Sequence, residues 1–234
     1  VDAPIGSDGQ PLGMIAQINC AELPENTLYP ESGMLQFWLN PRHPQWGMNI
    51  NDGLAGADAR VIYWEELGAA SPRAYAVEAN WEEHYWPIDP PTREISLIFG
   101  PPETPDPMLT WGDHERFIEI WNELYPDQAI EEIEELEDLV EEAEEDEDIL
   151  SAIADEAGYH QLGGYPVFFD DDPRRNNPEL EEYTVNLLTM GSESYRLGST
   201  ELLWGDAGYA NWLMTPEQLA ARDFSKVLFW WWQS

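Results

Sequence analysis

One run of acidic residues divides this 234-residue chain and limits what each part can fold into. From Glu131 to Asp148, thirteen of eighteen positions are Asp or Glu and none is basic. Apolar residues recur around and within the run at three- and four-residue steps, which places them on one face of a helix. They are Ile130, Ile133, Leu136, Val140 and Ala143. We predict an acidic amphipathic helix that starts near Asp127 and frays after about Glu142, where further acids oppose the helix dipole.

Strand-like segments lie on both sides of this helical region, which spans about 108–158. They are rich in β-branched and aromatic residues and are bounded by Gly and Pro, as strands are. The expected strands are Gly13–Asn19, Gly33–Leu39, Arg60–Trp64, Ala74–Glu78, Glu94–Phe99, Val167–Phe169, Tyr183–Met190, Glu201–Trp204, Tyr209–Met214 and Val227–Trp232. A short C-terminal helix follows Thr215, because Thr215, Pro216 and Gln218 form the pattern of a capping box. The chain is therefore predicted to be mainly β (α+β).

The two ends of the chain resemble each other. The segment LGMIAQINCAEL followed by GMLQFWLN parallels VNLLTMGSESY followed by GYANWLMT, and Ile15 to Phe37 is spaced much as Leu188 to Trp212. We interpret this as an internal duplication within a single domain over residues 1–234. The two β halves would lie at about 1–100 and 159–234, with the helical acidic insert between them.

Charge and cysteine usage limit the compartment and the partners. The chain carries 47 acidic and 10 basic residues, for a net charge of −37. Nucleic acid and anionic membrane surfaces are poor partners for it, because both require clustered Lys and Arg. The single cysteine, Cys20, cannot form an internal disulfide, so we expect a cytoplasmic protein in which Cys20 is a small buried hydrophobe. The first residues show no secretion signal, and a leader removed before Val1 is left open.

The strongest local motif is Trp204-Gly205-Asp206-Ala207-Gly208. Its glycines allow positive φ or close backbone approach, and Asp206 could bond backbone amides, so a tight turn with Trp204 packed on it explains the motif. The alternative is a pocket for a small ligand. Its candidate residues are Gln17, His160, Arg174, Trp204 and Asp206.

Two further features of this region suggest a site. Arg174, next to Arg175, either forms an ion pair that fixes its loop or recognises a carboxylate or phosphate. His160 precedes a glycine pair and the run Asp170–Asp172, a grouping that could form a carboxylate–imidazole site.

Signatures of catalysis are missing from the sequence. It contains no G-x-S-x-G elbow, P-loop or dinucleotide fingerprint, and its four histidines are scattered without metal-ligand spacing. We therefore expect no metal and no cofactor, and an enzyme is the less favoured class.

Three motifs together resemble a known family. They are G-G-x-P-x-x-F followed by D-P-R at 163–174, W-G-D-x-G at 204–208, and L-x-x-R-D-F-S-x-V at 219–227. This pattern is similar to that of the YwqG-like (DUF1963) family of uncharacterised bacterial proteins, and Pro11–Pro24 with Gly33–Asn40 fits that family's opening strands. The resemblance implies an antiparallel β roll of the YwqG type with peripheral helices, and no settled activity.

We hypothesise a protein-binding module. The contact residues would lie on the acidic helix at Glu134, Glu135, Asp138, Glu141, Glu142 and Glu145. Such a surface resembles those of inhibitors that bind basic nucleases, and YwqG-like genes occur near bacterial toxin modules, which implies an immunity-type inhibitor of a basic protein. One alternative is a small-ligand protein or weak hydrolase that uses the Trp204–Asp206 pocket. The other is that the acidity reflects salt adaptation, with no specific partner.

Overall fold

The structure is a computed structural model. It describes residues 3–49, 51, 53–54, 56–68, 86–89, 95–100, 118–119, 121–123, 125–132, 135, 160–168, 172–175, 177–193 and 201–233.

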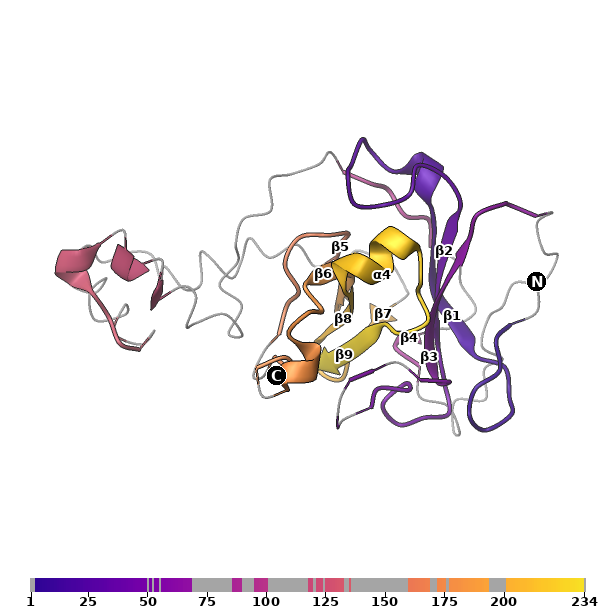
Figure 1. Cartoon of the computed structure of the whole chain (residues 1–234). Coiled ribbons are helices and arrows are strands. Elements are labelled where there is room, and N and C mark those ends of the chain that lie inside the picture. The colour runs from indigo at the N-terminus through magenta and orange to yellow at the C-terminus, as the bar shows by residue number, and fades with distance from the viewer. Residues whose placement is uncertain are drawn as a thin grey trace.

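Two antiparallel sheets form the body of the protein (Figure 1). The first has the order β1-β2-β3 and is built from β1 (Gly13–Asn19), β2 (Met34–Leu39) and β3 (Ala59–Trp64). The second has the order β5-β6-β8-β9 and is built from β5 (His160–Gln161), β6 (Val185–Gly191), β8 (Tyr209–Met214) and β9 (Leu228–Trp232). A small pair joins β4 (Ile88–Asp89) to β7 (Glu201–Leu202). The mainly β, antiparallel prediction is confirmed.

Large aromatic side chains fill the space between the two sheets. Phe37 of β2 meets Trp212 of β8 edge to face, with ring centroids 5.4 Å apart, and both side chains are fully buried. Trp46 and Trp204 extend this contact at 5.1 Å. Aromatic pairs of this kind add stabilising free energy to that of burying apolar area. The Phe37–Trp212 contact therefore holds β2 and β8 together near their middles.

The two sheets repeat one pairing pattern. The register of β1 with β2 shifts between Met14 and Ala16, and that of β6 with β8 shifts between Asn186 and Leu188. Directly after the shift, Ala16 faces Phe37, and Leu188 faces Trp212. The internal duplication stays a prediction. On this register Ile15 corresponds to Leu187, one residue from the match that spacing alone indicated.

The short helices sit at connections. They are η1 (Cys20–Glu22), η2 (Pro126–Gln128), η3 (Pro178–Leu180) and α4 (Pro216–Ala221). The capping box that the sequence predicts at α4 is present: the Thr215 hydroxyl accepts from the Gln218 amide, and the Gln218 side chain accepts from the Thr215 amide. None of the helices in the described part of the chain has the length and apolar character that crossing a bilayer requires.

Two of the expected strands, Glu94–Phe99 and Val167–Phe169, differ in the structure. Val167 and Phe168 are not in a strand, because the Asn211 side chain takes the place of a neighbouring strand at Val167. Residues 95–99 of the expected strand Glu94–Phe99 do not form a strand; Ile98 is 94% exposed, and Phe99 packs on the core. Apolar and β-branched content favoured a strand there, but none of the described strands pairs with this segment. The strand expected at Ala74–Glu78 lies outside the described residues.

The acidic helix does not begin at Asp127. Residues 126–128 form η2, and Ala129 and Ile130 are not helical. Ile130 is nevertheless buried, and the Asn122 side chain bonds both its amide (2.8 Å) and its carbonyl (2.9 Å). The helical periodicity therefore assigned Ile130 to the wrong element.

Candidate functional site

The Trp204–Gly208 motif forms a tight turn, as the structural interpretation predicts. Gly205 has φ of 65°, and the Gly208 amide donates to the Trp204 carbonyl at 2.8 Å. A Cβ on Gly208 would collide with the carbonyl oxygens of Trp232 and Trp204, so a side chain there has no room. The turn thus brings the chain back against the end of β9.

Within this turn Asp206 is exposed to solvent, whereas Trp204 is buried. Asp206 is exposed, and it is its backbone amide that bonds, donating to Gln233 Oε1 at 3.1 Å. Trp204 is fully buried, and its amide donates to Ser192 Oγ at 2.9 Å. Its ring meets those of Trp46 and Trp212. Trp204 is therefore a core residue without a surface to offer a ligand.

Arg174 holds its loop closed. Its Nε donates to both carboxylate oxygens of Asp172, at 2.8 and 2.9 Å, and Nη2 reaches the same carboxylate. Nη1 donates to the Tyr183 carbonyl at 3.2 Å, and the guanidinium lies over the Phe168 ring. Asp172 is buried to 3% exposure, so this is a largely dehydrated, bidentate pair. This geometry supports the loop-fixing interpretation of Arg174.

His160 and Gln17 have partners of their own. His160 Nε2 lies 2.9 Å from Glu193 Oε2 at the edge of the second sheet. Gln17 is exposed on β1 and accepts from Gln36 Nε2 at 3.4 Å. Asp170 and Asp171 lie outside the described residues. No hydrogen bond, ion pair or ring contact among the described residues joins any two of the five predicted pocket residues.

A buried polar network, which was not predicted, holds the G-G-x-P segment that begins at Gly163 against the second sheet. The Asn211 side chain bonds both the amide and the carbonyl of Val167, at 3.0 and 2.6 Å, as a neighbouring strand would. Asn186 donates to the Gly163 carbonyl and to Thr189. Both asparagines are about 1% exposed. They dock residues 163–167 on the second sheet without a ladder, and the only sequence signal was polar residues at inward positions of strands.

Cys20 is buried, as expected, at 3% exposure. Burial raises the pKa of the Cys20 thiol, which keeps it protonated at neutral pH. Within the described ranges, no three His, Cys, Asp or Glu side chains gather closely enough to hold a metal ion.

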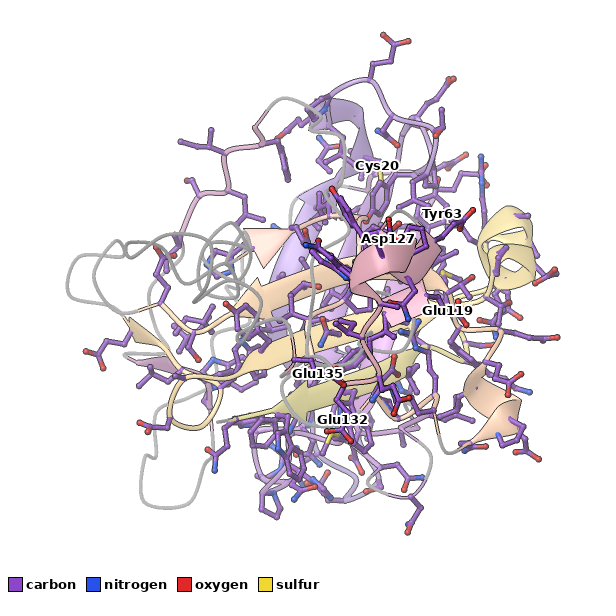
Figure 2. The ribbon with its side chains drawn as sticks, turned by 90° about the vertical axis from the view of Figure 1, so that its left-hand side faces the viewer. Cys20, Tyr63, Glu119, Asp127, Glu132 and Glu135 are labelled. Carbon is purple, nitrogen blue, oxygen red and sulfur yellow. The ribbon has the colours of Figure 1, made fainter. Side chains whose placement is uncertain are left out.

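The described residues of the acidic region lie apart from both sheets, at the far left of Figure 1. We call residues 118–119, 121–123, 125–132 and 135 the acidic unit. Figure 2, viewed from that side, labels Glu119, Asp127, Glu132 and Glu135 on it. All six of its acidic side chains are exposed, at positions 119, 123, 127, 131, 132 and 135. Among the contact residues predicted earlier, Glu135 is in the unit, whereas Glu134, Asp138, Glu141, Glu142 and Glu145 lie outside the described residues.

Comparison with known proteins gives a family but no activity. No curated protein matches the chain. The family model described as "Domain of unknown function (DUF1963)" matches residues 1–232, and the chain therefore belongs to this family.

Proposed function

We propose that this protein is a protein-binding module that takes a basic protein on its acidic unit. The observation that carries the proposal is the position of the unit, which stands away from the sheets with all six described carboxylates exposed (Figures 1 and 2). A charged surface in this position can reach a partner without any change in the β body.

Uncharged side chains make most of the contacts that hold the unit together. Asn122 clamps Ile130, and Trp121 Nε1 donates to the Gln128 carbonyl at 2.7 Å. The Trp121 and Tyr125 rings lie 4.6 Å apart. Of the carboxylates, Glu135 bonds inside the unit, to the amides of Glu131 and Glu132. Glu123, Asp127, Glu131 and Glu132 are thus available to a partner without cost to these contacts.

Electrostatics then favours a basic partner. Complementary charge raises association rates and selects among partners, and it does so most at low ionic strength. An immunity-type inhibitor that neutralises a basic toxin is the sharpest form of this proposal, and a regulator of another basic protein is the broader form.

The test compares two variants of equal charge. In the unit variant, Glu123, Asp127, Glu131 and Glu132 become Gln. In the body variant, four exposed acids of the β body, Glu25, Glu179, Glu181 and Glu217, become Gln. Each bait, and the unchanged protein, is used to capture proteins from host lysate at about 0.15 M salt, where the Debye length is about 8 Å.

We expect the unchanged protein and the body variant to retain one basic protein that the unit variant loses. The purified partner should then bind the unit variant at least about tenfold more weakly, since several charge-assisted contacts are lost. Equal losses in both variants would contradict the proposal, because they would show general attraction to a polyanion.

A further inference from the structure

A hollow of about 540 Å³ lies between β3 and the segment that connects α4 to β9. Residues of β3 form one wall, and Arg222, Phe224, Ser225 and Val227 form the other. Its size is within the range of about 300–1,000 Å³ that is usual for small-ligand sites. None of the five predicted pocket residues lines it.

The walls of the hollow are positive in a strongly negative protein. Of the described residues that line it, two are arginines, Arg60 and Arg222, and none carries a carboxylate. The backbone of Arg60 pairs with Trp38 of β2, but its guanidinium makes no ion pair or hydrogen bond with another described residue. Arg222 reaches Glu65 at 3.0 Å, but both side chains of that pair are well exposed, so the pair is weak and exchanges easily with a ligand.

The floor of the hollow is apolar, and its edge offers backbone donors. Val61, Phe224 and Val227 are buried core residues, and the Tyr63 ring lies 5.7 Å from that of Phe224. β3 is the outer strand of its sheet. Because Asn40 donates to the Asp58 carbonyl, alternation along the ladder turns the amides of Val61 and Tyr63 away from β2.

We infer that this hollow binds a small organic anion, with a carboxylate between Arg60 and Arg222 and an apolar or aromatic group on the floor at Phe224. Two guanidiniums supply charge-assisted donors for a carboxylate, and the amides of Val61 and Tyr63, which bond to no described residue, add further donors. A neutral molecule of the same shape would leave these donors unused. The inference is independent of the acidic unit, which contributes no residue to the hollow.

Replacing Arg222 by glycine can test the hollow without destabilising the fold. Its φ of 54° is left-handed, a conformation that costs a non-glycine residue energy and that glycine adopts freely. At this position, the end of α4, glycine is the common choice in helices. Arg222→Gly should therefore leave the melting temperature unchanged or raise it, while it removes one guanidinium from the hollow.

The experiment titrates the ¹⁵N-labelled full chain with phenylacetate and, in parallel, with phenylacetamide, and follows amide signals by NMR. For a ligand of this size we expect a dissociation constant of about 1 mM for phenylacetate. The shifted signals should be those of residues 59–63 and 222–227. Phenylacetamide should bind at least about tenfold more weakly, because it lacks the charge.

Four variants complete the test. Arg60→Gln and Arg222→Gly should each weaken phenylacetate binding about fivefold or more, and Ser225→Glu should abolish it by placing a carboxylate in the hollow. Arg175→Gln, an exposed arginine outside the hollow, is the control with the same charge change and should have no effect. Equal binding of the amide, equal loss with Arg175→Gln, shifts confined to other regions, or no shifts at 20 mM phenylacetate would each overturn the inference.

Discussion

Gly208 and Gly9 are glycines for two different physical reasons, lack of space and positive φ. Gly208 has no room for a Cβ, which would meet two backbone carbonyl oxygens, whereas Gly9 has φ of 75° and nothing within 4 Å of its Cβ position. Backbone atoms cannot move aside as a flexible side chain can. We predict that Gly208→Ala lowers the free energy of unfolding by about 3 kcal/mol, at the upper end of overpacking costs. Gly9→Ala should cost about 1 kcal/mol for its left-handed φ alone.

Urea unfolding followed by Trp fluorescence measures both changes. Equal, small losses for the two variants would show that the turn at 204–208 adapts and that its glycine has another role.

Single residues also show which features the sequence could and could not predict. Spacing indicated the turn and the ion-pair interpretation of Arg174, because both depend on near neighbours in sequence. The Asn211–Val167 bridge joins residues 44 positions apart, and no local pattern marks it.

At the scale of one element, α4 depends on its cap. A helix of six residues leaves most of its amides without helical partners, and Thr215 satisfies one of them by accepting from Gln218 at 3.2 Å. We predict that Thr215→Ala lowers the free energy of unfolding by about 1 kcal/mol. Thr215→Ser keeps the hydroxyl and should cost less than about 0.5 kcal/mol. Thermal or urea unfolding that ranks serine with alanine would show that the Thr215 methyl, rather than its hydroxyl, matters here.

Most strands were predictable because their pattern is local. Gly13–Asn19 and Tyr209–Met214 were predicted with the bounds that the structure shows, since glycine, proline or turn residues mark their ends. The short β4–β7 pair and the irregular course of 95–100 depend on which segments meet in space. The similar register shifts at Ile15 and Leu187 were likewise invisible, because a bulge changes pairing without changing apolar content.

Across the whole molecule, charge is distributed unevenly. The acidic unit carries exposed carboxylates away from the sheets, whereas the hollow beside β3 is lined by two arginines and no acid among the described residues. Composition predicted a negative protein and could not predict this separation. Arg60 and Arg222 are 162 positions apart, and only the packing of the α4–β9 connection against β3 brings them to one place.

The net charge of −37 also predicts how salt affects stability. Like charges repel in the folded state, and salt screens them: the Debye length falls from about 30 Å at 0.01 M to about 3 Å at 1 M. We expect the melting temperature to rise by about 5 °C over this range of NaCl, as about 1–2 kcal/mol would give in a chain of this size. The unit variant should change it by less than about 1 °C at low salt, because the unit stands apart from the sheets, while the body variant should raise it. Calorimetry decides between these outcomes. A melting temperature independent of salt would show that the acids of the body are already neutralised by their neighbours. If the melting temperature rises with salt and the capture experiment retains no partner, salt adaptation is left as the reason for the charge.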